Sequence, residues 1–246
     1  MTNLIALVPA RSGSKRLKDK NIKILEDHPL LAYTISSCLN SNIFEEVYCL
    51  TDSKDYADIA MKYGAKIPYL RPESNSGEHS PDILWVQEII NYIELNKKNV
   101  KSFCIARPTN PFRSDTSIKK AWECFSSNNI YHSLRAVSIC TEHPGKMWKI
   151  GNDNKTMFPI LPYELNNVSW HSNQKAALPE IYVQNASLEF SHISTVKKFN
   201  CIAGSIIQAF VSPKFEGFDI NDEIDWEVCK SLIKNKKAFL PKIYGK

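Results

Sequence analysis

The sequence lacks the patterns that would place it in several common classes of protein. It has no Cys-x-x-Cys pair, and its seven cysteines are scattered, so we expect neither a zinc site nor a disulfide framework. No apolar run is long enough to span a bilayer. Lysine and arginine form no dense stripe and the net charge is only +5, so a nucleic-acid surface is not expected either.

A secretory signal peptide is also absent, because an apolar run, Leu4–Val8, follows Met1 almost directly. We therefore expect the protein in the reducing cytoplasm, bound to neither membrane nor nucleic acid. The chain has 246 residues, of which 43% are apolar and 23% charged, and this suits one folded domain over 1–246. The mild positive charge suits a pocket for anionic small molecules.

Strand-like and helix-like patterns alternate along the chain. Continuous apolar runs predict buried strands, and apolar residues at helical spacing predict the helices between them. The predicted strands span 4–8, 46–50, 65–69, 102–106, 134–139, 188–193 and 203–211. Helices are predicted after Pro29, Ser53, Ser80, Pro111 and Asn221, with Ser53 and Ser80 as caps. The alternation predicts a Rossmann-like α/β fold with an open, mostly parallel sheet.

The stretch 142–184 departs from this alternation, since it is polar and weakly periodic. We interpret it as an insertion that serves as a lid or as an arm for dimerisation. In open α/β sheets the ligand binds beyond the carboxyl ends of the strands. The loops that follow Val8, Leu50, Ala106 and Val211 should therefore share one rim, and the binding site should lie there.

The loop after the first predicted strand is the leading candidate for that site. Its cations are Arg11, Lys15, Arg16, Lys18 and Lys20. A nucleoside triphosphate carries about four negative charges, so its site needs fixed cations and backbone N–H groups. Gly13 allows the backbone to approach a phosphate closely. The loop is neither a Walker A motif nor Gly-x-Gly-x-x-Gly, and on charge alone a solvated surface loop is the alternative.

A series of short motifs follows in order along nearly the whole chain. They are Ala6–Lys15, Lys20-Asn21, Thr51-Asp52, Leu70–Pro72, Ser80–Asp82, Arg107–Arg113, His143–Lys146, Leu178-Pro179, Gln184–Ala186 and Phe218–Asn221. Together they resemble the acylneuraminate cytidylyltransferases, the CMP-sialic acid synthetase family, which activates nonulosonic acids with CTP. The resemblance implies a fold of the nucleotide-diphospho-sugar transferase type, and we expect a homodimer that uses CTP and a sugar acid.

Carried over by position, the resemblance gives the catalytic task of binding and neutralising the triphosphate to Arg11, Lys15 and Lys20. The implied nucleotide-binding positions are Ala10, Arg11, Ser12, Gly13, Asn21, Arg71, Ser80 and Asp82, with Asn21 at the ribose and the last three around the cytosine. A pyrimidine edge needs a donor at its O2 atom and an acceptor at its N4 amine, which an arginine and a polar helix start can supply. The alternative is that Ser80 and Asp82 only cap their helix.

A magnesium site is expected beside the last helix. Asp219 follows the last predicted strand, and Mg²⁺ prefers oxygen ligands. The family pattern is Asp-x-Asp, but Asn221 occupies the second position here, so one negative charge is missing. We expect Mg²⁺ on Asp219 and Asn221, and the alternative is that both residues cap the last helix.

The acceptor side departs further from the family. Arg107-Pro108-Thr109-Asn110-Pro111 replaces Gln-Pro-Thr-Ser-Pro, Lys175 and Val183 stand where the family has arginines, and Asn185-Ala186 replaces Asn-Gly. The implied sugar-binding positions are Arg107, Thr109, Lys146, Lys175, Gln184 and Asn185. The sugar carboxylate needs a cation, which Arg107, Lys146 or Lys175 can supply. These departures favour an acceptor of the legionaminic or pseudaminic kind, or a related 3-deoxy sugar acid, over plain N-acetylneuraminic acid.

The predicted reaction joins CTP to a 2-keto-3-deoxy sugar acid and gives a CMP-sugar and pyrophosphate. A cytidylyltransferase for an octulosonate is one alternative, with the same chemistry and a different acceptor. A glycosyltransferase is another, but the Asp-x-Asp expected near its mid-chain is absent. A non-catalytic nucleotide-binding relative is the third, and only Asn221 points to it.

Overall fold

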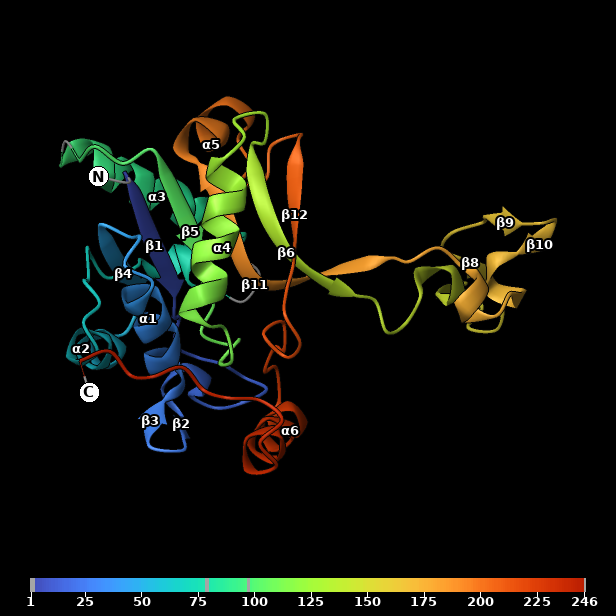
Figure 1. The fold of residues 1–246 in the computed structure, drawn as a ribbon, viewed down its shortest axis with the longest axis horizontal. Helices are drawn as coiled ribbons and strands as arrows, with labels where there is room; N and C mark the ends of the chain where they lie inside the picture. Colours follow the sequence, from blue (N-terminus) through green and yellow to red (C-terminus); the bar gives the residue numbers. More distant parts are fainter. Residues whose placement is uncertain (1–2, 78–79, 97, 246) are drawn as a thin grey trace. The chain divides into compact units, whose positions relative to one another are not determined.

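A computed structural model describes residues 3–77, 80–96 and 98–245 and contains one central six-stranded sheet (Figure 1). Its strands, in spatial order, are β12 (Ile207–Val211), β6 (Ser133–Ile139), β11 (Tyr182–His192), β5 (Ser102–Ile105), β1 (Leu4–Pro9) and β4 (Glu46–Leu50). Strand β1 pairs in parallel with β4 and β5, whereas β11 runs antiparallel to β5. The α/β fold predicted from the alternation of patterns is confirmed.

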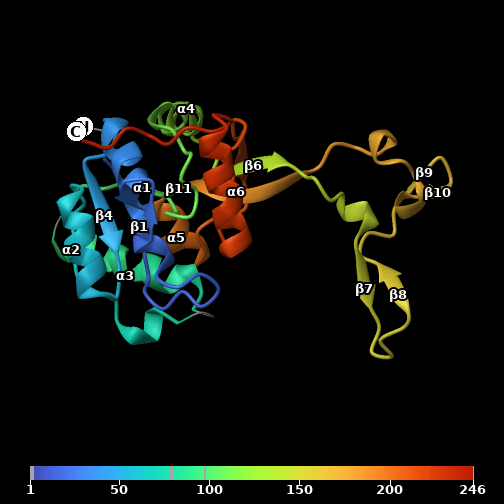
Figure 2. The ribbon, with the colours of Figure 1, turned by 90° about the horizontal axis from the view of Figure 1, so that it is seen from below.

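Helices cover both faces of this sheet (Figures 1 and 2). They are α1 (Leu30–Asn40), α2 (Lys54–Lys62), α3 (Asp82–Leu95), α4 (Asp115–Ser126) and α5 (Ile193–Phe199). Helix α6 (Glu223–Lys234) packs in a third cluster with Leu17, Leu25 and Leu30. Successive side chains of a strand point to opposite faces. Leu4 and Ala6 of β1 therefore pack in the cluster that contains α1, α2 and α4, while Ile5 and Leu7 pack in the cluster of α3 and α5.

Of the two serines predicted to cap helices, one does so in the structure. Ser53 caps α2, because its hydroxyl accepts a hydrogen bond from the Tyr56 N–H group. The prediction for Ser80 is wrong, since Pro81 is the N-cap of α3 and the Ser80 hydroxyl donates to the Ser74 carbonyl instead. The Ser80 hydroxyl binds the carbonyl of a residue six positions earlier in the chain, and the spacing of residues at the helix start does not predict this contact.

Two further predictions about local structure differ from the structure. The predicted strand at 65–69 is reduced to a single bridge between Lys66 and Tyr48. In α6 the helical spacing of Ile224, Val228 and Leu232 predicts an apolar inner face, but Ile224 is 75% exposed, and Trp226 and Cys229 are buried instead. The helix carries two apolar stripes, and the one with the larger tryptophan surface is buried.

Residues Val137–Gln184 form a compact unit of their own, distinct from the unit made of 1–136 and 185–246. This unit begins five residues before the segment predicted as an insertion. Its chain forms two antiparallel pairs, β7 (Trp148–Ile150) with β8 (Met157–Pro159) and β9 (Glu164–Leu165) with β10 (Val168–Ser169) (Figure 2). Within this unit the Trp170 ring packs against the rings of His143 and Tyr163, with ring centroids 5.5 and 5.0 Å apart.

A small hairpin, β2 (Ile24–Leu25) with β3 (His28–Pro29), precedes α1.

All seven cysteines are free thiols. Among the described residues, no helix combines the length and the apolar character needed to cross a membrane.

Ala186 on β11 has a φ angle of +57°, in the left-handed region. This conformation costs a residue with a Cβ atom about 1–2 kcal/mol, and glycine avoids that cost. We expect Ala186→Gly to raise the free energy of unfolding by about 0.5–1 kcal/mol, because glycine also adds entropy to the unfolded chain. Urea denaturation with an unchanged m-value would measure this. Ala57→Gly within α2 should instead destabilise by about 1 kcal/mol, and a loss of stability in both variants would contradict the prediction.

Candidate functional site

A cavity of about 210 Å³ lies at the edge of the sheet where the parallel strands end. The carboxyl ends of β1, β4 and β5 meet at this edge because the three strands are parallel. The cavity is lined by Pro9, Arg11, Ser14, Lys20, Asn21, Arg71, Gly77, Ser80, Asp82, Trp85, Arg107, Pro108 and Thr109. Two of the four loops predicted to share the rim, those after Val8 and Ala106, line this cavity, together with Arg71, Gly77 and the start of α3; the loops after Leu50 and Val211 are not among its lining residues.

A second cavity of about 340 Å³ shares Arg11, Ser14 and Lys20 with the first. Its other lining residues are Lys15, Arg16, Leu17 and Asn221. The shared residues make the two cavities neighbours, with the basic loop as their common wall. The second cavity holds four cationic side chains and no carboxylate among its described lining residues, so it favours an anion such as a polyphosphate.

The basic loop is held in shape by Asp52, which follows β4. The Ser12 backbone N–H and hydroxyl both donate to the Asp52 carboxylate, each at 2.7 Å. Gly13 has a φ angle of +70°, which glycine adopts without strain. Asn21 closes the loop, since its amide donates to the Arg11 carbonyl at 3.0 Å. The supporting role of Asp52 was not predicted, although it belongs to a motif that the sequence analysis noted.

Lys20 connects the basic loop to the segment before α6. Its ammonium group donates to the Ile220 carbonyl at 2.7 Å. Burial lowers the pKa of Lys20; Asp219 opposes this shift, while Arg16 and Arg11 add to it. A bound anion would offset the electrostatic repulsion among these three cations.

Asp219 presents one oxygen that is not used within the described protein. Its Oδ2 accepts a hydrogen bond from the Asn221 side-chain amide at 2.9 Å, whereas Oδ1 is buried and has no described hydrogen-bond partner. Helix α6 is capped by Asp222, which accepts from the N–H groups of Ile224 and Asp225. The alternative in which Asp219 and Asn221 cap this helix is therefore wrong. An unpaired buried carboxylate oxygen suits a hard cation.

The described residues contain no cluster of three or more His, Cys, Asp or Glu side chains that could hold a metal ion. A metal at Asp219 would therefore need ligands from a substrate and from water, as Mg²⁺ sites beside phosphates commonly have. Asn221 is partly engaged, because its Oδ1 accepts from Arg16 at 3.4 Å.

Arg71, Trp85 and Asp82 also line the first cavity. The Arg71 guanidinium lies over the Trp85 ring at 5.6 Å, and its Nε is buried without a described hydrogen-bond partner. Trp85 donates to Asp82 at 2.9 Å. Burial alone would raise the pKa of Asp82, but Arg107, Trp85 and Arg71 outweigh it and lower that pKa, so the carboxylate is ionised at neutral pH.

Three cations were predicted to bind the sugar carboxylate, and one of them, Arg107, lines this cavity. Thr109, which was also predicted to bind the sugar, lines it too. Lys146 and Lys175 belong to the second unit, where Lys146 donates to the His171 and Asn173 carbonyls. Lys175 donates to the Thr141 carbonyl, and Gln184 is the last residue of that unit.

Asn185 is not among the residues that line the cavity; its amide donates to Ser212 at 2.9 Å, and its carbonyl accepts from Asn110.

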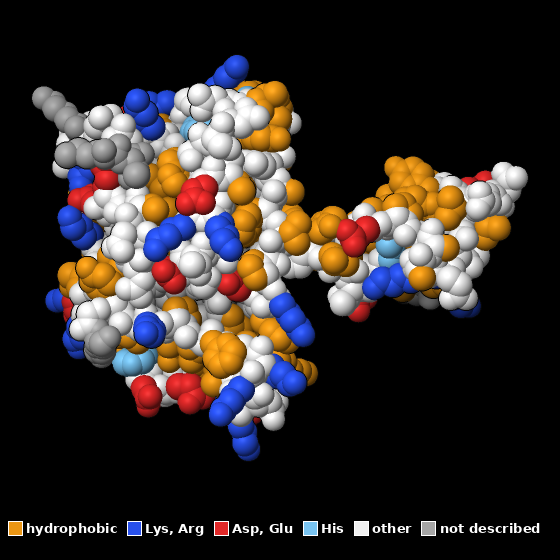
Figure 3. Space-filling view, in the orientation of Figure 1, with side chains coloured by type: hydrophobic (Ala, Val, Ile, Leu, Met, Phe, Trp, Pro, Cys, Tyr) orange, Lys and Arg blue, Asp and Glu red, His pale blue; other side chains and the backbone are white. Residues whose placement is uncertain are grey.

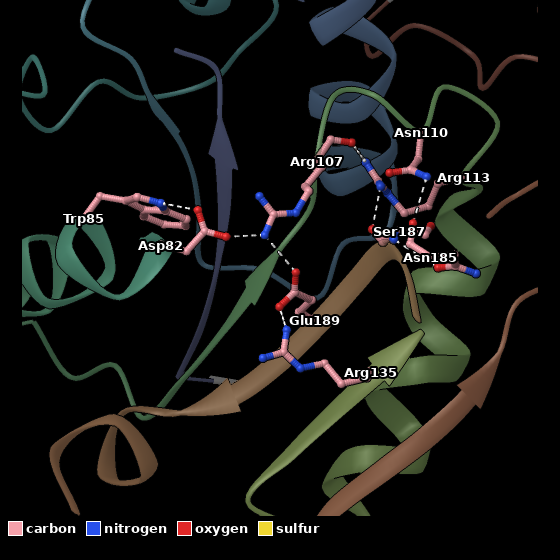
Figure 4. Close-up of polar contacts among 9 residues, drawn as sticks. All are labelled: Asp82, Trp85, Arg107, Asn110, Arg113, Arg135, Asn185, Ser187 and Glu189. Atoms are coloured by element: carbon pink, nitrogen blue, oxygen red, sulfur yellow. Dashed lines mark hydrogen bonds and ion pairs between the residues drawn. The ribbon is translucent and has the colours of Figure 1, made fainter. Parts of the chain in front are cut away.

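Three charged residues that sequence reasoning did not assign to the site lie near Arg107: Arg113 and Glu189 are buried, and Arg135 is half-buried (Figure 4). Arg113 donates to the Arg107 carbonyl at 3.1 Å and so holds its backbone. The side chain of Arg107 pairs with Asp82 and with Glu189, and Glu189 pairs in turn with Arg135. The signal was present in the alternation of β11 and β6, because each of these strands places a charge between two buried apolar residues.

The comparisons with known proteins identify the family of this chain. A family model described as cytidylyltransferase matches residues 5–157. The pseudaminic acid cytidylyltransferase of Campylobacter jejuni is 35% identical over 234 residues, which cover 95% of this chain and 97% of that protein. The N-acylneuraminate cytidylyltransferase of Escherichia coli is 32% identical over 240 residues; the match covers 96% of this chain but only about half, 53%, of that longer protein.

The fold is shared with a solved structure of a CMP:2-keto-3-deoxy-manno-octonic acid synthetase complexed with CTP. The TM-score is 0.67 at 13% identity, and the superposition covers 95% of this chain and 99% of that chain. At this identity the likeness concerns the fold alone. The ordered motifs predicted the family, the family match extends over more than half of the chain, and the chain belongs to the cytidylyltransferase family.

Proposed function

We propose that the protein transfers the CMP group of CTP to a 2-keto-3-deoxy sugar acid of the nonulosonate class. The observation that carries the proposal is the pair of adjoining cavities, which share Arg11, Ser14 and Lys20. In the second cavity, all of the described charged lining residues are cations, and this suits a triphosphate. The other has the mixed donors and acceptors that a base and a sugar acid need.

Cytosine would lie at the end of the first cavity lined by Arg71, Ser80 and Asp82. The buried Nε of Arg71, which lacks a described hydrogen-bond partner, supports this placement, because the O2 atom of cytosine is an acceptor. The carboxylate of Asp82 can accept from the N4 amine, since each of its oxygens accepts only one described hydrogen bond. Asn21, at the mouth of the loop, is proposed to contact the ribose.

In the proposed reaction the anomeric hydroxyl of the sugar acid attacks the α-phosphorus of CTP, and the bond to the pyrophosphate breaks. The chain supplies position and charge neutralisation, with Arg11, Lys15 and Lys20 at the phosphates. Of the described residues that line the cavity, only Asp82 is a carboxylate, and Trp85 and Arg107 already engage it. We therefore propose that a phosphate oxygen of CTP takes the hydroxyl proton.

The proposed cofactor is Mg²⁺, held by Asp219 and more weakly by Asn221. The buried, unpaired Oδ1 of Asp219 fits an oxygen-seeking cation. When bound, the ion would neutralise charge on the triphosphate. The proposed location is the cytoplasm, which the seven free thiols support.

The proposed acceptor is a nonulosonate of the pseudaminic or legionaminic kind. The relative from Campylobacter jejuni, named for pseudaminic acid, is similar over nearly its whole length, whereas the octulosonate synthetase shares the fold at 13% identity. An octulosonate acceptor is therefore the second candidate.

Pyrophosphate release from CTP, with Mg²⁺ and a panel of sugar acids, tests the proposed function. We expect release with a pseudaminic or legionaminic acid derivative at a kcat/KM at least about tenfold above that for N-acetylneuraminic acid or the octulosonate, a difference of 1.4 kcal/mol. UTP in place of CTP is the control for the base and should give no turnover. If CTP binds but no sugar acid releases pyrophosphate, the enzyme assignment is wrong.

We also propose that the second unit joins two copies of the chain. Its exposed apolar side chains support this, and they are Ile150, Met157, Phe158, Ile160, Tyr163 and Val168. Hydrophobic side chains are visible on this unit in Figure 3. Such surface is costly to leave in water and is typical of a subunit interface.

Sedimentation velocity should therefore give a dimer for the wild type and a monomer for Phe158→Asp, because a charge in the centre of an apolar interface is not paired. The matched control is Phe239→Asp, a phenylalanine of the other unit that is even more exposed, at 73% against 55% for Phe158, and it should leave the dimer intact. A monomeric wild type, or a dimer that persists in the Phe158 variant, would refute this arrangement.

A further inference from the structure

Glu189 is a carboxylate buried in the central sheet at 2% exposure. Its neighbours on β11, Leu188 and Phe190, pack in the cluster that faces α1 and α4. Glu189 therefore points to the opposite face of the sheet, toward α3. It pairs with Ile105, the last residue of β5, two residues before Arg107. The strand register thus brings this carboxylate directly behind the acceptor side of the cavity.

Arg135 reaches Glu189 from the neighbouring strand β6. Leu134 and Ala136 face the cluster of α1 and α4, so Arg135 shares the face of Glu189. The two carboxylate oxygens are divided between the two arginines. Oε1 accepts from Arg107 Nη2 at 3.0 Å, and Oε2 pairs with Arg135 Nη1 (Figure 4).

Two carboxylates therefore fix the Arg107 guanidinium through the same terminal nitrogen. Nη2 donates to Asp82 as well as to Glu189. Figure 4 shows its other terminal nitrogen pointing away from both carboxylates. An arginine fixed in this way loses little side-chain entropy when its remaining N–H groups bind a further anion.

The charges around the cavity leave a surplus for such an anion. The ion pairs around Arg107 join two carboxylates, Asp82 and Glu189, to two arginines, Arg107 and Arg135, and so carry no net charge by themselves. Arg11, Lys20 and Arg71 add positive charge to the cavity lining. Burial and the neighbouring Arg107 lower the pKa of Arg135 to about 10, which leaves it cationic at neutral pH. Without Arg135, two carboxylates would offset the charge of Arg107 and weaken its attraction for an anionic ligand.

We propose that Glu189 and Arg135 are positioning residues for acceptor binding: Arg135 holds Glu189, and Glu189 fixes Arg107 so that its guanidinium receives the carboxylate of the sugar acid. The inference rests on the proposed function. Neither Glu189 nor Arg135 is among the residues that line the cavity, and we expect them to set the affinity for the acceptor without changing the affinity for CTP.

Kinetics of Glu189→Gln test this inference. The amide keeps the shape of the side chain but loses its charge, so Arg107 is less firmly held. We expect KM for the sugar acid to rise about tenfold or more, while KM for CTP changes less than about twofold. The matched control is Glu46→Gln, a carboxylate at the opposite end of the sheet that pairs with Lys66 and Lys98. It should leave both KM values unchanged.

A double variant guards against simple misfolding, because Glu189→Gln alone leaves the half-buried Arg135 unpaired. Arg135→Met combined with Glu189→Gln removes both charges. If Arg135 acts only through Glu189, the double variant should raise the acceptor KM no further than Glu189→Gln alone. Effects of the two changes that multiply, or an equal rise in KM for CTP, would overturn the inference.

The failure of the inference is distinguishable from failure of the proposed function. Wild-type turnover with an unchanged acceptor KM in folded Glu189→Gln would overturn the positioning role alone. A wild type that binds CTP but turns over no sugar acid would overturn both.

Discussion

Lys20→Met is expected to lower kcat for CMP transfer by about 10²–10³-fold, the loss typical of removing one fixed donor from a developing negative charge. Lys20 belongs to both adjoining cavities and is anchored on the Ile220 carbonyl. Its burial makes the loss large, because a charge held in a dry site acts more strongly than one in water. Methionine keeps most of the length and apolar volume of the side chain and removes its charge and its hydrogen bond to the Ile220 carbonyl. Pyrophosphate release under saturating CTP and sugar acid measures the effect.

Lys18→Met is the matched control, since Lys18 lies exposed in the same loop and lines neither cavity. Its kcat should remain within about twofold of the wild type, because exposed charges contribute little. Equal losses in both variants would mean that the overall charge of the loop matters and that Lys20 has no special position. An active Lys20 variant would remove Lys20 from the catalytic residues.

Asp219→Ala is expected to lower the rate by at least about 10²-fold and to raise the Mg²⁺ concentration needed for half-maximal activity. The reason is the buried Oδ1, which no described protein group satisfies. Asn221→Asp should have the opposite effect on the metal, because it adds the second carboxylate of the family pattern. Titration of activity with Mg²⁺, together with direct metal binding in the presence of CTP, measures both changes.

The control for this pair is Asp222→Ala, which removes the cap of α6. It should reduce stability by about 1 kcal/mol and leave the Mg²⁺ requirement unchanged. If Asp219→Ala only destabilised the protein to a similar extent, with the Mg²⁺ requirement unaltered, Asp219 would be a structural residue.

Local features of the sequence predicted most of the elements correctly. The runs at 4–8, 47–50 and 103–105 are apolar throughout, a pattern typical of strands buried on both faces. Failures occurred where two local solutions compete. In α6 two apolar stripes of similar length were available, and packing against the segment before the helix selected Trp226 over Ile224.

More of the residues predicted for the nucleotide than of those predicted for the acceptor line the first cavity, although Ala10, Ser12 and Gly13 are not among its lining residues. Arg11, Lys20, Asn21, Arg71, Ser80 and Asp82 all line one cavity, as the ordered motifs required. On the acceptor side, Arg107 and Thr109 reached the cavity, while Lys146, Lys175 and Gln184 lie in the second unit. Their contribution to sugar binding stays a prediction.

The sequence by itself determined the basic loop, the alternation of strands and helices and membership of the family, because these features depend on residues close together in the chain or on motifs in a fixed order. Only the tertiary structure decided that Glu189 lies behind Arg107, 82 residues away in the chain. That contact depends on β11 inserting between β5 and β6 with one register. A shift by one residue would turn the carboxylate to the other face of the sheet, and no local pattern specifies which strands become neighbours.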